Sequence, residues 1–287
     1  MATAEGGGNI IRNGLVLYLD AANKKSIVNG ETVWKDIEKF PAYDVNFIND
    51  TQFQDINSGP IRFDGTDDYA VRPYTSGDLY DINITGEITI DVWVRFDDVL
   101  DPEGSIISFG RPYGNNSAGH YQWELMKLNT NYPSAGGECK IVFAVSNLTQ
   151  ITRVNLNTND GIFNPVNSLP PQDNTWFNLT FTYKTSTDEL IAYYNSENAG
   201  GDYLNNITTT PQIPAVAYQD LNIGAASDLA GAFAMRGNIA SIKIYNRVLT
   251  PQEISENYNF LKSRFSFQAD SSNNQYVEDG YIDDYFE

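Results

Sequence analysis

The feature that most constrains this chain is a strict alternation of side chains over the nine residues Ile88–Phe96. The even-numbered positions carry only Ile, Val and Phe, whereas the odd-numbered positions carry Thr, Asp, Trp and Arg. Successive side chains of a β-strand point to opposite faces of the sheet, so a period of two predicts a strand with one apolar and one polar face. We therefore expect a half-buried strand in a sheet that packs one face on a core.

Other short apolar runs are separated by clusters of Gly, Asn and Asp, such as the turn signal Asn198-Ala199-Gly200-Gly201. Aromatic residues make up 13% of the chain, and Tyr and Phe both favour strands. Many short strands between turn clusters indicate a sandwich or a barrel. Further strands are expected at 15–19, 61–63, 69–71, 105–109, 121–128, 141–145, 176–183, 190–194, 221–223 and 239–245.

One helix is predicted near the C-terminus. Thr250 is a favourable N-cap, Pro251 suits the first helical position, and Glu253 completes a capping box. The apolar positions that follow lie four and three residues apart, on one helical face. The sequence therefore predicts an all-β fold, a two-sheet antiparallel sandwich, with one short helix packed at its edge.

The 287 residues divide into three expected parts. Residues 1–13 are expected as a flexible arm, because three consecutive glycines follow Glu5. Residues 14–265 are expected to form one sandwich. Residues 266–287 carry six acidic residues and no basic ones, with interspersed aromatics, and such a tail is expected to stay disordered or to order on a partner.

The formal net charge of −19 excludes some partners. A nucleic-acid binder needs a basic stripe against the phosphates, and an anionic membrane repels an acidic surface. The first nine residues lack a basic region followed by an apolar core, so no signal peptide is expected. No run of 18 apolar residues exists, and a single cysteine excludes an intrachain disulfide. We therefore expect a protein made in a host cytoplasm, without membrane insertion.

Four stretches together resemble a known family. Residues 14–23 (GLVLYLDAAN), Trp34-Lys35-Asp36, the turn 63–69 (FDGTDDY) and the segment 237–254 are similar to the laminin G-like type of concanavalin A-like lectin/glucanase domains. Such domains occur in bacteriophage structural proteins and in bacterial surface proteins. The resemblance implies a jelly roll over residues 14–265. Members often carry acidic residues in the closing strand, one of which can help to hold calcium, whereas this chain has Ala240 and Ser241 there.

Glycoside hydrolysis is not expected. The glucanases that share this fold carry Glu-x-Asp-x-x-Glu or a near variant on one strand, and this chain does not. Glu87 and Asp91 would share a face, but four residues separate them by roughly 13 Å. Hydrolysis needs carboxylates about 5–5.5 Å or about 6.5–9.5 Å apart. Glu124, on another predicted strand, remains a candidate partner for a pair across strands.

Two kinds of binding site are candidates. Trp93 and Trp123 lie in predicted strands and would stack on sugar rings if exposed; alternatively, Trp93 packs under a covering loop. Asp64, Asp67 and Asp68 lie in one turn, and an oxygen-rich turn suits Ca²⁺. The alternative is that this Asp-Gly-Thr-Asp-Asp segment is ordinary turn chemistry.

These features predict a non-enzymatic virion structural protein, a capsid decoration, fibre or tail component of a phage with some capacity to bind host-surface glycans. The termini would attach it to other virion proteins or to further copies of itself. The alternative is a carbohydrate-binding lectin or an adhesion module at a bacterial cell surface. Fold alone does not decide between them, because this architecture hosts lectins, glycosidases and virion parts.

Overall fold

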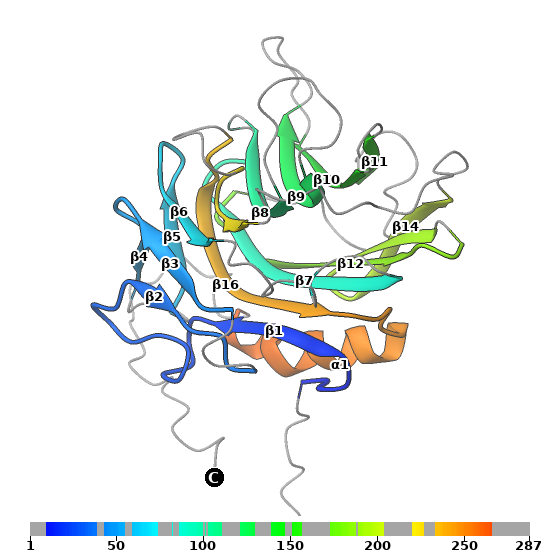
Figure 1. The fold of residues 1–287 in the computed structure, drawn as a ribbon, viewed down its shortest axis with the longest axis horizontal. Helices are drawn as coiled ribbons and strands as arrows, with labels where there is room; N and C mark the ends of the chain where they lie inside the picture. Colours follow the sequence, from blue (N-terminus) through cyan, green and yellow to red (C-terminus); the bar gives the residue numbers. More distant parts are fainter. Residues whose placement is uncertain are drawn as a thin grey trace, which may run out of the picture.

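The computed structural model arranges the chain in two stacked sheets, named sheet A and sheet B, with one helix outside them (Figure 1). Every described strand pair is antiparallel. This confirms the predicted all-β sandwich with a C-terminal helix. The described residues are 10–38, 43–54, 59–73, 82, 86–99, 101, 103–110, 121–129, 139–146, 151–156, 173–187, 189–203, 220–226 and 233–265.

Sheet A has the strand order β14-β13-β12-β7-β16-β5-β4, and β1 also pairs with β16. Sheet B has the order β11-β10-β9-β8-β15-β6-β3-β2. The strands of sheet A are β1 (Leu15–Asp20), β4 (Gln52–Phe53), β5 (Ile61–Asp64), β7 (Glu87–Phe96), β12 (Phe177–Lys184), β13 (Glu189–Tyr194), β14 (Glu197–Tyr203) and β16 (Arg236–Tyr245). Those of sheet B are β2 (Val33–Trp34), β3 (Val45–Ile48), β6 (Tyr69–Arg72), β8 (Gly104–Gly110), β9 (Tyr121–Asn129), β10 (Cys139–Ser146), β11 (Ile151–Leu156) and β15 (Leu221–Ile223).

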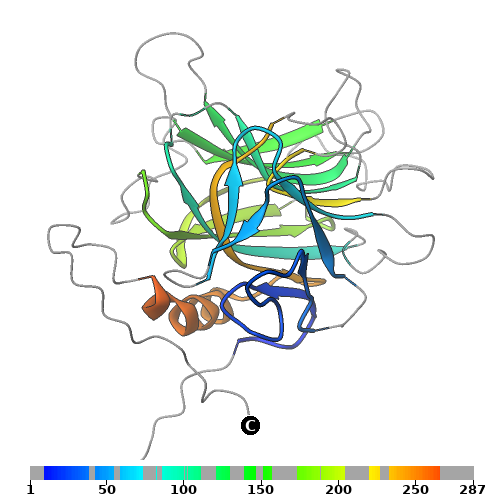
Figure 2. The ribbon, with the colours of Figure 1, turned by 90° about the vertical axis from the view of Figure 1, so that its left-hand side faces the viewer.

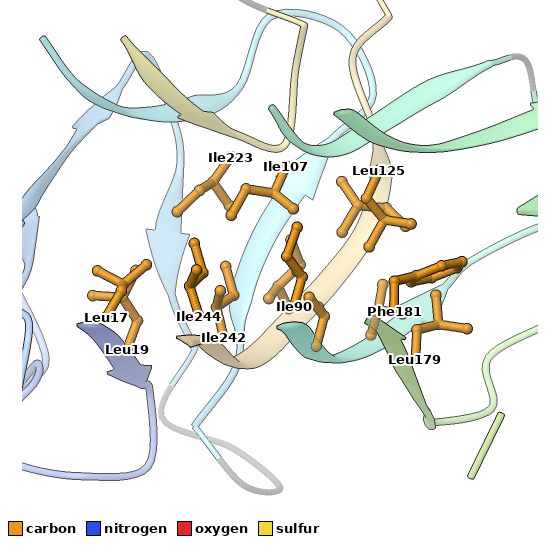
Figure 3. Packing of buried hydrophobic residues seen from close by; sticks show 14 of the residues in the cluster. Leu17, Leu19, Ile90, Ile107, Leu125, Leu179, Phe181, Ile223, Ile242 and Ile244 are labelled. Atoms are coloured by element: carbon orange, nitrogen blue, oxygen red, sulfur yellow. The ribbon is translucent and has the colours of Figure 1, made fainter. Parts of the chain in front are cut away.

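The main core lies between the two sheets. Figure 3 shows aliphatic and aromatic side chains of both sheets meeting there, among them Ile90 and Ile242 from sheet A and Leu125 from sheet B. The apolar positions of β7 all belong to this core, as the alternation predicts. The polar face of β7 is also buried, however: Asp91 is 0% and Trp93 2% exposed. The prediction of a half-buried strand is therefore wrong for its outer face.

The outer face of β7 is covered by the helix α1 (Pro251–Leu261). This helix continues into the short 3₁₀ helix η2 (Lys262–Arg264). The predicted capping box is confirmed, because Thr250 Oγ1 accepts from the Glu253 amide and the Glu253 carboxylate accepts from the Thr250 amide. Glu253 also pairs with Arg247 at 2.6 Å, which anchors the start of the helix. Among the described residues, no helix is long and apolar enough to cross a membrane.

Helix α1 lies on the outer side of sheet A, away from sheet B, rather than at the edge of the sandwich (Figures 1 and 2). Two small apolar clusters join them. Tyr18, Tyr245 and Ile254 belong to one, and Trp93, Leu261 and Phe265 belong to the other. Sheet A is therefore apolar on its core face and closed by the helix over much of its outer face.

Two sequence assignments differ from the structure. The stretch 198–201, predicted as a turn from its glycines, lies inside strand β14 at the end of sheet A. The hairpin turn is Asn195-Ser196, where both residues take positive φ (50° and 67°). Glycine lowers strand propensity, but cross-strand pairing with β13 overrides it.

The start of the described chain packs on the helix. Ile10, which the sequence assigns to the flexible arm, is 4% exposed, and the Ile11 amide donates to Asn257 Oδ1 at 2.9 Å. Residues 10–13 thus contact the folded body. The predicted arm before them and the predicted acidic tail, 266–287, lie outside the described residues.

Candidate functional site

The two tryptophans predicted to stack on sugars are both buried. Trp93 is stacked against Tyr258 and Phe265, with ring centroids 5.4 and 4.1 Å away, beneath α1 and η2. Trp123 points into the main core at 0% exposure, and its indole N–H donates to the Ile82 carbonyl at 3.0 Å. Neither ring offers a face to a sugar, so the expectation of a stacking platform on these residues does not hold. The cover over Trp93 is a helix rather than the loop weighed as the alternative.

The candidate carboxylates lie on opposite sides of the sandwich. Glu87 and Asp91 are on the outer face of sheet A, because Ile90 between them points into the core. Glu124 is on the outer face of sheet B, because Leu125 next to it points into the core. Stacked sheets lie about 10 Å apart, and these side chains point away from one another. Glu124 cannot therefore complete a hydrolytic pair with Glu87 or Asp91.

The structure brings the three predicted metal ligands together. One carboxylate oxygen each of Asp64, Asp67 and Asp68 lies within 4.8 Å of the others, in the turn between β5 and β6. Gly65 takes a φ of +83° in this turn, and a Cβ there would lie 2.7 Å from Cβ of Arg236. The glycine is therefore required both by the turn and by its neighbour.

Turn chemistry accounts for part of this arrangement. Asp64 Oδ1 accepts from the Thr66 amide at 2.7 Å, and Asp68 Oδ2 accepts from the Asp64 amide at 3.0 Å. Burial would raise the pKa of Asp64, but the hydrogen bonds that its carboxylate accepts, from the backbone amides of Thr66, Asp67 and Asp68, outweigh it and lower that pKa. Burial, with the charges of Asp64 and Asp67, raises the pKa of Asp68 to about 6.

One oxygen of this turn is left over. Asp68 is 2% exposed, and its Oδ1 is buried without a hydrogen bond. Three carboxylates with a spare buried oxygen fit a hard cation such as Ca²⁺. The closing strand does not fit a calcium ion, because Ala240 and Ser241 supply no carboxylate and Ala240 packs in the apolar cluster with Trp93.

The outer face of sheet A carries two polar groups of residues that differ in their pairing. The first, named the paired row, consists of Thr180, Asp91 and Lys243, which are adjacent across β12, β7 and β16. Lys243 Nζ lies 2.7 Å from Asp91 Oδ1, and Thr180 Oγ1 donates to Asp91 Oδ2 at 3.1 Å. Both charged side chains are at most 1% exposed. Every carboxylate oxygen and the ammonium have partners, so this row is structural.

The second group, named the unpaired cluster, consists of Trp93, Arg95, Asn238 and Ser241. Asn238 pairs with Arg95, and Ser241 pairs with Trp93, on neighbouring positions of β16 and β7. Five of its polar atoms are buried without a hydrogen-bond partner: Trp93 Nε1, Arg95 Nε, Asn238 Nδ2, Asn238 Oδ1 and Ser241 Oγ. Such atoms are rare in native proteins, and their concentration at one place calls for a ligand or ordered water.

A β-bulge creates this cluster. The register of β16 against β7 shifts between Ile239 and Ser241, with Ala240 as the extra residue. Asn238 and Ser241 are three residues apart and would otherwise point to opposite faces, whereas the bulge turns both outward. Sequence reasoning missed both residues, since alternation alone does not reveal a bulge. The signal was the replacement of the acidic residues expected after Gly237-x-Ile239.

Comparison with solved structures finds the same fold at low sequence identity. The binding domain of botulinum neurotoxin DC in complex with rat synaptotagmin II is 15% identical, with a TM-score of 0.57 over 86% of this chain and 52% of that chain. A structure of botulinum neurotoxin type C, whose cell entry is described as dependent on two ganglioside molecules, is 16% identical, with a TM-score of 0.58 over 86% of this chain and 51% of that chain. The chain thus spans about half the length of these neighbours.

No curated protein sequence matches this chain. The family model for the concanavalin A-like lectin/glucanases superfamily, of the laminin G type, matches residues 64–255. The match covers more than half of the chain and includes the acidic turn, both groups of outer-face residues and the start of α1. This chain therefore belongs to the concanavalin A-like lectin/glucanase superfamily.

Proposed function

We propose that this chain is a non-catalytic, lectin-like binding module for glycans. The observation that carries the proposal is the unpaired cluster. Five buried polar atoms without partners cost stability, and a polyhydroxylated ligand supplies the donors and acceptors that would satisfy them. The family hosts both lectins and hydrolases, so the choice between these two functions has to be argued from the residues of the site.

The carboxylates support the non-catalytic part of this proposal. Asp91 is neutralised by Lys243 beneath the helix, and Glu87 accepts from the Val248 amide at 3.1 Å and pairs with Lys184 at 3.3 Å. These groups stabilise the fold where a glycosidase would need them free to reach substrate. Glu124 lies beyond both, on the far sheet.

We place the module on a virion, as a capsid decoration, fibre or tail component, where it would meet host-surface glycans. The support is the resemblance to laminin G-like domains of phage structural proteins together with the net charge of −19, which disfavours contact with nucleic acid. Mass spectrometry of purified particles tests this placement. Recovery of the chain in a bacterial surface fraction, and not in particles, would assign it to the alternative location.

A glycan array together with a hydrolysis screen tests the binding function. We expect retention on a subset of glycans and no release of reducing sugar from β-glucans, agar, carrageenan or alginate. Glu124→Gln and Glu87→Gln are the catalytic controls, and both should bind glycans as the wild type does. Turnover that disappears in either variant would show that the module is an enzyme.

A further inference from the structure

We infer that the unpaired cluster binds the carboxylate group of an acidic sugar, with Arg95 and Asn238 as the principal contacts. The inference rests on the proposed glycan-binding function and names the class of ligand and the site. It follows from the position of the cluster, from the way the neighbouring charges are paired, and from the balance of donors and acceptors.

The first step is position. Arg62 on β5, Asn238 on β16 and Arg95 on β7 are direct neighbours across three strands. Adjacent strands lie about 4.8 Å apart, so the Cα atoms of the two arginines lie roughly 10 Å from each other, on either side of Asn238. The amide is 0% exposed, and both of its polar atoms lack partners. A polar group fixed between two cations is poised to contact an anion.

The second step is the pairing of charges. Arg62 makes two hydrogen bonds to Asp97, at 2.6 and 3.0 Å, and Arg236 lies 3.6 Å from Asp97 and 3.5 Å from Asp101. Within the described part of the chain, Arg95 makes no ion pair. Its guanidinium instead lies over the ring of Trp176, 5.6 Å from the ring centre. Among the described residues, Arg95 is thus a cation without an ion-paired carboxylate, although the charge of Asp97 lies near enough to act on it.

The third step is the chemistry of the atoms without partners. Arg95 Nε, Trp93 Nε1 and Asn238 Nδ2 are donors, whereas Asn238 Oδ1 is an acceptor and Ser241 Oγ can act as either. A set rich in donors and carrying one positive charge complements an acceptor group with one negative charge. A carboxylate meets this description, whereas a phosphate dianion would bring a second charge without a counterion. A metal cation is disfavoured because the cluster has no carboxylate.

The fourth step is access. Arg95 is half-buried, whereas Trp93, Asn238 and Ser241 are at most 2% exposed, so Arg95 is the side from which a ligand would approach the cluster. Trp93 and Phe265 close the opposite side under the end of α1. A sugar acid could therefore insert its carboxylate while its ring stays at the surface.

Isothermal titration with a matched pair of sugars tests this inference. D-Glucuronate and D-glucose differ only in the carboxylate, and we expect binding of glucuronate and none of glucose at this site. Arg95→Gln should weaken glucuronate binding by about 10- to 100-fold, the range for loss of a charged hydrogen bond. Lys184→Gln removes one positive charge at the opposite end of β7, where Lys184 pairs with Glu87, and should leave the affinity unchanged.

Asn238→Asp provides a second variant that does not depend on loss of a side chain. It places a carboxylate beside Arg95 within the protein, so it should fold, as circular dichroism would show, and lose glucuronate binding. Inorganic phosphate and acetate are the anion probes, and acetate should compete at least as well as phosphate. Stronger competition by phosphate would overturn the assignment to a carboxylate.

The outcomes separate this inference from the proposed function. If neutral glycans bind and Arg95→Gln leaves their affinity unchanged, the module is a lectin and the carboxylate site is wrong. If no glycan binds on the array but acetate and glucuronate bind in an Arg95-dependent manner, the anion site is supported and the proposed lectin function is wrong. If neither acid binds to the wild type, ordered water alone satisfies the cluster and the inference is wrong.

Discussion

The paired row and the unpaired cluster lie on the same face of sheet A and share strands β7 and β16. In the paired row, the Asp91 carboxylate and the Lys243 ammonium satisfy each other at 0% exposure of both residues. In the unpaired cluster, the Asn238 amide is equally buried, and both of its polar atoms lack partners. The polar atoms of the paired row find their partners within the chain, whereas those of the unpaired cluster need a ligand or water.

The bulge at Ala240 lies within the unpaired cluster, between Asn238 and Ser241, and helps to explain why the two groups differ. After the bulge the register is regular, and Lys243 lies directly opposite Asp91, with which it pairs. At the bulge this regular pairing is interrupted, because Ala240 is an extra residue with no partner of its own on β7. Bulges often occur beside functional sites, and this one lies inside the candidate binding site.

The largest expected effect comes from breaking the paired row. Lys243→Met leaves the Asp91 charge buried without a counterion, which should lower the free energy of unfolding by about 3–5 kcal/mol in urea denaturation. The double variant Asp91→Leu/Lys243→Met removes both charges and should recover most of this loss. A loss below about 1 kcal/mol in the single variant would mean that water reaches the pair, and the contrast between the two groups would then weaken.

The next largest effect concerns the cover over the unpaired cluster. Phe265 lies 4.1 Å from Trp93 and 5.0 Å from Trp176, measured between ring centroids, and it is 8% exposed. Phe265→Ala should lower the free energy of unfolding by about 2–3 kcal/mol, at or below the lower end of the range for a fully buried phenylalanine. Quenching of Trp fluorescence by acrylamide should increase at the same time. Unchanged quenching would show that Trp93 is covered by something other than this ring.

A pair of matched substitutions tests the comparison directly. Asn238→Leu replaces a partnerless amide by an apolar group of similar size and should raise the free energy of unfolding by about 1 kcal/mol. Thr180→Val is the matched change in the paired row, and it should lower stability by about 1–2 kcal/mol because Asp91 Oδ2 loses its donor. Opposite signs in thermal or urea unfolding would support a binding role for Asn238, since binding residues are often suboptimal for stability. Equal losses would place Asn238 in the structural framework.

The sequence predicted those parts of the fold that depend on local signals. The capping box at Thr250 and Glu253 needs only neighbouring residues, and the alternation in β7 reports side-chain direction. Neither signal says what covers a face. The outer face of β7 is buried because α1, more than 150 residues later in the chain, lies on it.

The candidate site was less accessible to sequence reasoning. Trp93 was selected because it lies on the polar face of a strand, but its partners Tyr258 and Phe265 come from a remote helix. Asn238 and Ser241 become neighbours of Arg95 and Trp93 only through strand pairing and a bulge, neither of which leaves a local pattern. The acidic turn was found because its three aspartates lie within five residues.

The smallest expected effect extends the comparison to that turn, where Asp68 Oδ1 is a buried oxygen without a hydrogen bond. Burial and the charges of Asp64 and Asp67 raise the pKa of Asp68 to about 6, so the folded state holds this proton more tightly than the unfolded state. The resulting stability is present below the ordinary aspartate pKa and is lost as pH rises through about 6. Asp68→Asn removes the charge. Its free energy of unfolding should therefore exceed that of the wild type at pH 7 by about 0.5–1 kcal/mol, allowing for solvent screening, and should match it near pH 4. Thermal unfolding across this range measures the difference.

Millimolar CaCl₂ at pH 7 should raise the Tm of the wild type and leave the Tm of Asp68→Asn unchanged. An equal response of both proteins to pH and to calcium would show that the turn binds neither a proton nor a metal through Asp68.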